Sequence, residues 1–404
     1  MREGPGDWNK CSNRRVFFMV TALPLDGEGR YSSASLRRHP SLSMTFTSLR
    51  ATLLVCAASA VLAPRLQAQR EAPGLRLHWY RGNTHTHTKN SDGDGSPLRA
   101  AEWYREHGYQ FVVITDHEYL TDVTGINSVI GAPGRFLVMR GQEVTQWSAD
   151  PHRRSAHVNA IGNNAVVYPV GKTRCIGEGC GRMADADVPL ADTYKHNIDG
   201  ILAAGGLAQV NHPNGWWAVK PADLYAIPDS TLLEIWNATP GAHNRGGTDD
   251  SGHVAISTEA LWDTLLTRGK VVWGVGSDDT HDYFKTEGPD VNPPGKGWIV
   301  VQADTLTPEA IMTAMHQGHF YASNGVTLKD VVVSDTMVSI TVKPAEDERY
   351  HTRFMGSGGR ILADIPGTHP SYRIRPTDGY VRAVVIDSND LMAWTQPTFV
   401  RRGK

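Results

Sequence analysis

The motif His85-Thr86-His87 has the spacing of a metal-binding pair, because it follows a short apolar run that is expected to form a β-strand. Residues i and i+2 of an extended chain point to the same face, so the two imidazoles should converge. Imidazole nitrogens and carboxylates are preferred ligands of divalent transition metals. The pair alone is a weak signal, and its weight depends on the rest of the chain.

Seven further metal-competent side chains lie beside apolar runs along the chain: Asp92, His117, Glu143, His157, His212, Asp279 and His281. Taken singly, an aspartate of this kind is equally a turn residue, and a lone histidine is more often part of a core. Nearly all of them, however, follow a predicted strand. The carboxyl ends of the strands of a parallel α/β barrel share one face, where active sites are built. The joint pattern therefore favours a metal site over nine separate structural roles.

These motifs, as a set, resemble the PHP superfamily, which is named for its polymerase and histidinol phosphatase members. The branch that they resemble includes carbaryl-hydrolase-like secreted metallohydrolases. The resemblance covers residues 77–325 and rests on six motifs: His85-Thr86-His87 with Asp92, Thr115-Asp116-His117, Gly141-Gln142-Glu143, His157, Asn211-His212-Pro213, and Gly276-Ser277-Asp278-Asp279-Thr280-His281. It implies an α/β fold, a distorted seven-stranded (β/α) barrel of the PHP type.

The resemblance also implies two or three divalent ions, zinc, manganese or iron. Their ligands would be His85, His87 and Asp279 for the first ion, Glu143 as a bridge to a second ion held by His157 and His212, and Asp92, His117 and His281 for a third. Two adjacent aspartates stand in the last motif, so Asp278 is the alternative to Asp279. Asp116 is expected to orient an imidazole through a hydrogen bond.

Clustered divalent ions suit the hydrolysis of a small-molecule phosphate ester. The hypothesis is that a metal-bridging hydroxide attacks phosphorus, with Glu143 in the centre and with His212 or His281 assisting proton transfer. Lys89, Arg153, Arg154 and Lys285 stand near the ligand motifs and are candidates to pair with phosphate oxygens.

Three other interpretations stay open. A carboxylic ester or carbamate hydrolase could use the same metals. An amidohydrolase barrel also begins with a His-any-His pair, but it would not explain Asp116, His117 or Glu143. A non-catalytic binding protein with structural metals is the third, and structural zinc sites are usually closed and single.

Short β-rich runs alternate with helical stretches from residue 77 onward, which is the pattern of βα units. Helices are predicted over 97–107, 192–204 and 259–268, and strands over 111–115, 135–140, 157–161, 207–210, 231–236 and 270–275. After residue 323 only β runs follow, over 328–333, 337–342, 352–355 and 380–386. We therefore expect a metallohydrolase barrel over 69–324 and a small C-terminal β-sandwich over 325–404.

The overall charge is nearly balanced, with 40 Lys plus Arg against 42 Asp plus Glu in 404 residues. This balance argues against a nucleic acid polymer or an anionic membrane surface as partner. The oligomeric state does not follow from the composition.

A signal peptide is predicted near the start of the chain. Met44 would begin it, Arg50 provides the positive charge, and the apolar run 51–63 is followed by a cleavage point near Ala68. Residues 1–68 would then be untranslated or removed, and the mature protein would be secreted or periplasmic without a membrane span, because thirteen apolar residues are fewer than the roughly 20 that a bilayer requires. In such a compartment Cys175 and Cys180 could form a disulfide.

Overall fold

The computed structural model describes residues 77–149, 154–169, 188–249 and 251–400. The predicted signal peptide, the cysteine pair and Arg153 lie outside the described residues. Among the described helices, none is long and apolar enough to cross a membrane.

The first part of the described chain contains the strands β1 (His78–Asn83), β2 (Phe111–Ile114), β3 (Leu137–Trp147), β4 (Ser155–Ile161), β5 (Leu207–Val210), β6 (Thr231–Asn237), β7 (Gly247–Thr248), β8 (Val254–Ala255), β9 (Val272–Ser277), β10 (Trp298–Ala303) and β11 (Phe320–Ser323). Its helices are α1 (Pro97–Glu106), α2 (Thr124–Ile130), α4 (Leu190–Ala203), α5 (Thr258–Thr267) and α6 (Pro308–His316), with the 3-10 turns η1 (Gly215–Trp217) and η2 (Pro221–Leu224). The C-terminal part contains β12 (Leu328–Val333), β13 (Met337–Val342), β14 (Tyr350–Gly356), η3 (Ser357–Gly359), β15 (Arg360–Pro366), β16 (Ser371–Arg373), β17 (Tyr380–Asp387), β18 (Met392–Thr395) and β19 (Thr398–Phe399).

The helices begin and end at the residues that local chemistry favours. Ser96 accepts a hydrogen bond from the backbone amide of Arg99 and starts α1, with proline in the first turn, and Gly108 with φ +77° follows its end. Ser257 starts α5 in the same way. Helices α2 and α6 add to the three that were predicted, although Thr307 and a following proline mark the start of α6 in the sequence.

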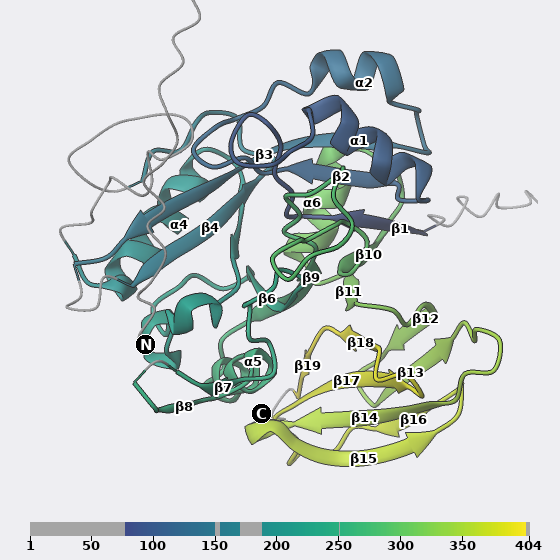
Figure 1. Ribbon diagram of the computed structural model, residues 1–404. Helices are drawn as coiled ribbons and strands as arrows, with labels where there is room; N and C mark the ends of the chain where they lie inside the picture. Colours follow the sequence, from purple (N-terminus) through teal and green to yellow (C-terminus); the bar gives the residue numbers. More distant parts are fainter. Residues whose placement is uncertain (1–76, 150–153, 170–187, 250, 401–404) are drawn as a thin grey trace, which may run out of the picture. The chain divides into compact units, whose positions relative to one another are not determined.

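One mixed sheet carries the described α/β part and runs in the order β15-β14-β17-β18-β11-β10-β1-β2-β3-β4-β5-β6-β9 (Figure 1). The pairs β1–β2, β2–β3, β5–β6 and β6–β9 are parallel, as expected. Strand β4 is antiparallel to both of its neighbours, which the prediction of a largely parallel sheet missed. The reason is that only residues 148–154 separate β3 from β4, whereas a parallel return would need a crossover of a dozen or more residues.

The predicted closed seven-stranded barrel is not confirmed, because the hydrogen-bonded strand path ends at β9 among the described residues. A single parallel bridge between Thr86 and Thr280 nevertheless joins the segments that follow β1 and β9. The amide of Asp279 donates to the carbonyl of His85 at 2.9 Å, and the amide of His87 donates to the carbonyl of Thr280 at 3.0 Å. The two ends of the parallel part of the sheet therefore meet at the level of the predicted ligands.

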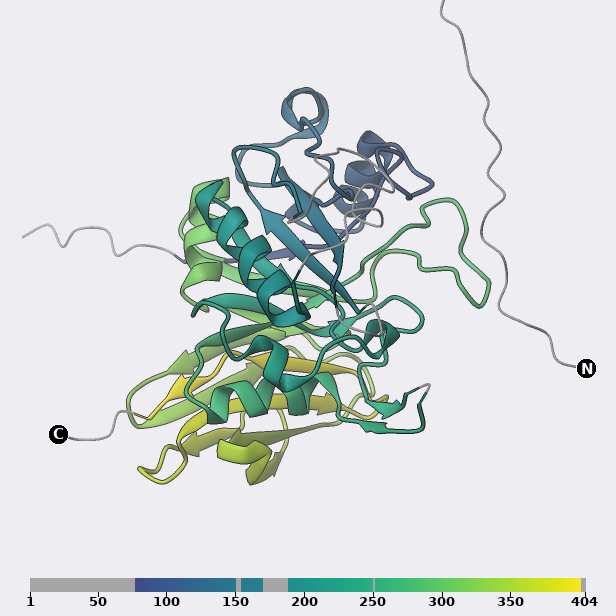
Figure 2. The same cartoon turned by 90° about the vertical axis from the view of Figure 1, so that its left-hand side faces the viewer.

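Helices α4 and α6 pack against strands of this sheet and cover its outer face (Figure 2). Their buried residues, such as Ile198 and Ile311, belong to the same apolar cluster as Val158, Val210 and Val301 of the strands. This burial is the main driving force that holds the strand ends in place.

The C-terminal strands form the end of the large sheet and a second sheet in the order β12-β13-β16. Buried side chains of both sheets, among them Ile340 and Val385, share one apolar cluster. The large sheet continues into this part because β11 pairs with β18. A second link is the fully buried Arg382, whose guanidinium bonds the carboxylate of Asp263 on α5 at 2.7 and 2.8 Å.

Candidate metal centre

The segment from His85 to His87 extends β1 and is held from both sides. The amide of Thr115, after β2, donates to the carbonyl of Thr86 at 2.9 Å, and the segment after β9 bonds its other edge. Because the backbone is extended here, successive side chains point to opposite faces. The Thr86 side chain contacts the Tyr283 hydroxyl on one face, and both histidines lie on the other. As predicted, the two Nε2 atoms converge, and they lie 3.1 Å apart.

Glu143 lies at the centre of the cluster, with its two carboxylate oxygens facing different groups. Oε2 lies 3.3 Å from Nε2 of His85 and 3.2 Å from Nε2 of His87. Oε1 lies 2.8 Å from Nδ1 of His157 and 3.6 Å from Nε2 of His212. Glu143 is in the middle of β3 and not after a strand as predicted, because β3 continues past the site to pair with β4.

His157 is the third residue of β4, near the amino end of that strand. Because β4 is antiparallel to its neighbours, this amino end lies at the same edge as the carboxyl ends of β3 and β5. The strand direction was wrongly predicted, yet the side chain reaches the cluster. His212 follows β5 and adopts φ +22°, which directs its ring to within 4.7 Å of the His157 ring.

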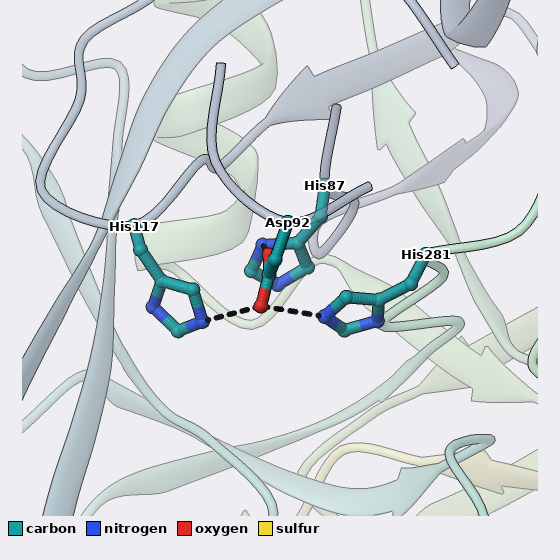
Figure 3. Close-up of side chains that lie close together, drawn as sticks. All are labelled: His87, Asp92, His117 and His281. Atoms are coloured by element: carbon teal, nitrogen blue, oxygen red, sulfur yellow. Dashed lines mark ion pairs between the residues drawn. The ribbon is translucent and has the colours of Figure 1, made fainter. Parts of the chain in front are cut away.

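Asp92 joins three histidines on the open side of the cluster (Figure 3). Its Oδ2 lies 3.5 Å from Nε2 of His117 and 3.5 Å from Nε2 of His281, and its Oδ1 lies 3.2 Å from Nδ1 of His87. These four residues form one group whose ligand atoms lie within 4.8 Å of one another. The group matches the third ligand set suggested by the sequence, with His87 added.

Two further groups have the same compactness: His85, His87 and Asp279, and His117, Glu143 and His157. The first coincides with the first predicted ligand set. In the second, His117 stands where His212 was expected. His117 and His87 each belong to two groups, so the cluster is continuous and its ligands are shared.

The choice between the two adjacent aspartates follows from where they point. Oδ1 of Asp279 lies 3.1 Å from Nε2 of both His85 and His87. Asp278 points away from them and accepts hydrogen bonds from the Tyr104 hydroxyl and from the amides of residues 295, 296 and 297. Asp279 adopts φ +49°, and this turn sends the two side chains in different directions.

Asp116 does not take the role expected of it. Its carboxylate accepts from the amide and hydroxyl of Thr88 and from the hydroxyls of Ser91 and Thr121, at 2.7 to 3.0 Å, and from no imidazole of the described residues. It therefore organises the loop that carries Asp92. Its connection to the histidines is indirect, through the Ser91 hydroxyl, which lies 3.4 Å from Nδ1 of His87.

Glu234 is a part of the site that was not predicted. This fully buried carboxylate on β6 lies 2.7 Å from Nδ1 of His85, and it accepts the backbone amide of His212 at 2.5 Å and the Ser277 hydroxyl at 2.6 Å. It thus connects β6 to the segments after β1 and β5 and to the last residue of β9. A glutamate inside the apolar run that forms β6 was the available signal, since an ionised side chain is rarely buried without a partner.

The protonation of two rings suits metal binding. Nδ1 of His85 faces the Glu234 carboxylate, and Nδ1 of His281 lies 2.9 Å from the carbonyl oxygen of Asp279. Both partners are acceptors, so Nδ1 carries a proton, and Nε2, which faces the cluster, becomes available to an ion once any proton on it is displaced. Metal-binding histidines commonly hold their second nitrogen in this way.

The spacing of the donor atoms fits a metal as well. Nε2 of His85, Nε2 of His87 and Oδ1 of Asp279 are each 3.1 Å from the other two. Ligand atoms at about 2.0–2.2 Å from a shared ion are about 2.8–3.6 Å apart in tetrahedral or octahedral arrangements. The residues present therefore fit a divalent ion.

The carboxylates and the imidazoles shift one another's pKa values. Burial favours the neutral ring of His85, but Asp279 and Glu234 outweigh it and raise its pKa to about 10. Burial also opposes ionisation of Glu143, yet the nearby imidazoles, led by those of His117 and His85, hold its pKa well below the usual range. Burial dominates at His117 and lowers its pKa to about 3. Without a cation, the negative charge of the cluster is balanced by protons on some imidazoles, which a bound metal would displace.

The cluster is most open to solvent on the Asp92 side. The side chain of His281 is 29% exposed and that of Asp92 is 20% exposed, whereas those of His85 and His87 are fully buried. The side chains of His117, His157 and His212 are 12%, 11% and 10% exposed, so the His157 and His212 end of the cluster is also open to solvent. Of the cationic residues considered for phosphate, Arg154 is engaged by the Asp223 carboxylate and Lys285 lies 3.5 Å from the Asp282 carboxylate.

Replacing Glu234 by glutamine is expected to weaken metal binding and also to lower the free energy of unfolding, because its two oxygens face five donors and the glutamine NH2 group would face some of them. The amide keeps the shape but loses the charge that holds Nδ1 of His85, and a change of this kind typically costs about 10- to 100-fold in metal affinity. Competition with a chelator of known affinity would measure the change, and circular dichroism would report the fold. Glu106, 62% exposed at the end of α1, gives the matched Glu106→Gln control. Equal metal affinity in Glu234→Gln and the control would contradict this role.

No protein-family model matches the sequence, and no curated protein is significantly similar to it. Among solved structures, the chain is similar to a two-domain protein containing a predicted PHP-like metal-dependent phosphoesterase from Bacteroides vulgatus, with 15% identity and a TM-score of 0.41 over 74% of this chain and 86% of that chain. It is also similar to an amidohydrolase from Chromobacterium violaceum, with 12% identity and a TM-score of 0.33 over 52% and 93% of the two chains. A lesion-specific endonuclease from Pyrococcus furiosus shares 13% identity, with a TM-score of 0.33 over 59% and 56%. At these TM-scores the likeness carries no argument about function.

Proposed function

We propose that this chain is a metal-dependent hydrolase of small-molecule phosphate esters that holds two or three divalent ions. The observation that supports this most is the position of Glu143, whose Oε2 faces His85 and His87 while its Oε1 faces His157 and His212. A carboxylate placed in this way can be shared by two neighbouring ions. A structural site would use a closed set of four ligands around one ion.

Bound divalent ions would lower the pKa of a water molecule and polarise the phosphoryl group of the substrate. The chain's own residues supply the rest. Buried His85, His87 and Glu143 fix the ion sites and exclude solvent from one side. The more exposed His281 holds Nε2 towards the Asp92 carboxylate at the open side of the cluster, with its Nδ1 proton bonded to a backbone carbonyl. Where Nε2 of His281 is not bound to an ion, we assign to it the uptake of the proton that the attacking water releases and its delivery to the leaving oxygen.

The finer architecture belongs to the same proposal. The bridge between Thr86 and Thr280 supports a ring of seven strands, β1 to β6 and β9, around the metal centre. The shared apolar cluster of the two C-terminal sheets supports a small sandwich over residues 325–404. The likeness to a secreted PHP branch and the export of the mature chain stay part of the proposal, as does the division into domains at residues 69 and 325.

The test combines metal analysis with a substrate panel on the purified full-length protein. Elemental analysis should find two or three divalent ions per chain. Nitrophenyl phosphate or bis-nitrophenyl phosphate should be hydrolysed, and nitrophenyl acetate should be a poor substrate. Removal of the ions by a chelator should abolish turnover, and added zinc, manganese or iron should restore it.

Two results would overturn the proposal in different ways. Faster hydrolysis of the acetate than of both phosphates, with the same metal dependence, would favour a carboxylic ester or carbamate hydrolase. A full complement of ions with no hydrolysis of any of these esters would favour a non-catalytic metal-containing protein.

A further inference from the structure

A large aromatic side chain, Trp216, stands exposed at the edge of the metal centre. Its side chain is 69% exposed, and the centroid of its ring lies 5.6 Å from those of the His157 and His212 rings. These imidazoles belong to the cluster around Glu143. The exposed indole therefore offers an apolar face directly beside two histidines of the cluster.

The loop that carries Trp216 is held firmly. The side-chain amide of Asn214 donates to the carbonyls of His243 and Ile256 at 3.1 and 2.8 Å. Trp217 stacks on the His243 ring with 4.1 Å between centroids. Trp216 therefore lies between two anchored residues, Asn214 and Trp217, and the loop holds its side chain in an exposed position.

The turn that precedes this residue follows the His212 ring closely. The amide of Gly215 donates to the carbonyl of His212 at 2.7 Å, and a Cβ at position 215 would lie 2.9 Å from Nδ1 of His212. Only glycine lets the chain pass so near to that ring. The indole of Trp216 is consequently placed against the histidines themselves.

The backbone of Trp216 has an unfavourable conformation for a bulky residue, with φ +49° and ψ +21°. Trp217, with φ +54°, shares the left-handed region. A bulky residue with a positive φ persists only when its surroundings impose it, and such residues concentrate at functional sites. The partly buried Trp217 stacks on the His243 ring, whereas the Trp216 ring lies beside the His157 and His212 rings and is otherwise largely exposed.

We infer that Trp216 is a specificity-determining residue that stacks on a planar aromatic or heteroaromatic leaving group of the substrate. The inference rests on the proposed function, because it takes the ester to be cleaved at the adjacent metal centre. An indole face offers a broad apolar and polarisable surface, and ring stacking rewards planar partners beyond simple burial. The substrate class would be aryl or heteroaryl phosphate esters.

Two other predicted ligands are followed, within three residues, by an exposed aromatic side chain. Tyr119 follows His117 by two residues and is 38% exposed, and Phe284 follows His281 by three residues and is 65% exposed. The backbone amide of Phe284 is anchored by the carboxylate of Asp94 at 3.3 Å. Each exposed ring is thus carried by a segment that also supplies a histidine to the cluster.

The experiment measures the binding of phenylphosphonate and methylphosphonate to the metal-loaded protein by calorimetry, together with the hydrolysis of phenyl phosphate and methyl phosphate. The two phosphonates share the anionic group and differ in the ring. The unchanged protein should bind phenylphosphonate more tightly, and Trp216→Ala should weaken that binding by about 2- to 12-fold while changing methylphosphonate binding by less than about twofold.

Two further variants separate ring stacking from apolar bulk. Trp216→Phe keeps a planar face and should restore most of the preference, and Trp216→Leu keeps apolar bulk and should not. All three replacements keep a Cβ, so the backbone conformation is penalised similarly in each.

The outcomes that overturn the inference are distinct from those that overturn the proposed function. If phosphate esters are hydrolysed but the unchanged protein binds both phosphonates equally, or Trp216→Ala weakens both equally, the inference is wrong and the function stands. Equal rescue by leucine and phenylalanine would remove the requirement for a planar group. If neither phosphonate binds and no phosphate ester is hydrolysed, the proposed function fails and the inference fails with it.

Discussion

Replacing Glu143 by alanine is expected to reduce turnover by about a thousandfold or more, equal to roughly 4 kcal/mol of transition-state stabilisation. The reason is its central position. Its two oxygens approach His85 and His87 on one side and His157 on the other, so removal of this side chain disturbs every neighbouring ion site. Steady-state hydrolysis and elemental analysis of the same preparation would measure turnover and metal content together.

Glu143→Gln sharpens the result. Glutamine keeps the length of the side chain and one acceptor oxygen, but it loses the negative charge and replaces the second oxygen with an amide nitrogen. Both variants should lose ions, and both should remain folded, because the histidines around them can stay neutral. Glu106→Ala, on the surface of α1, should retain full activity. If Glu143→Ala kept turnover within about tenfold of the unchanged protein, Glu143 would not belong to the active centre.

Replacing each of the two adjacent aspartates by asparagine should affect different properties: metal binding at Asp279 and stability at Asp278. Asp279→Asn is expected to lower metal affinity and turnover by about 100-fold or more while preserving the fold, because its Oδ1 is the atom that meets both His85 and His87. The positive φ of Asp279 is compatible with asparagine, so the backbone should not change.

Asp278→Asn is expected to lower the free energy of unfolding by about 2–4 kcal/mol. Its carboxylate is fully buried and accepts three backbone amides from residues 295–297 and the hydroxyl of Tyr104. An asparagine would turn an N–H group towards some of these donors. Burial raises the pKa of Asp278 and these hydrogen bonds oppose the rise, which shows how closely the side chain is enclosed.

Urea denaturation and metal titration of the two variants form one comparison. The expected pattern is a stability defect confined to Asp278→Asn and a metal defect that is much larger in Asp279→Asn. If Asp278→Asn lost its ions while its stability stayed unchanged, the two roles would have to be exchanged.

Much of the candidate site could be derived from residue types and spacing. The His-any-His pair converges because alternation along an extended chain is a local property, and strand β5 ends directly before Asn211 and His212 as its apolar pattern predicts. Helices α1 and α5 follow from their caps and from the glycines after them, which are local signals as well.

Other features depended on contacts between distant residues. The direction of β4, and with it the route by which His157 reaches the cluster, depends on pairing with β3 and β5. Glu234 was missed because its partners His85 and Ser277 are far away along the chain. The role of Asp116 was assigned wrongly because its neighbours in space are hydroxyl groups, two of them from the loop after β1, nearly thirty residues earlier in the chain.

Local periodicity thus specified the kind of side chains that gather at this end of the sheet, because it depends only on backbone geometry. The orientation of each group was decided by the folded molecule. Asp279 and Asp278 have the same chemistry and adjacent positions, and one left-handed turn sends the first to the histidines and the second to the 295–297 loop. A residue's neighbours in three dimensions determine which of two equal carboxylates can meet a cation, and these neighbours exist only once the distant strands have come together.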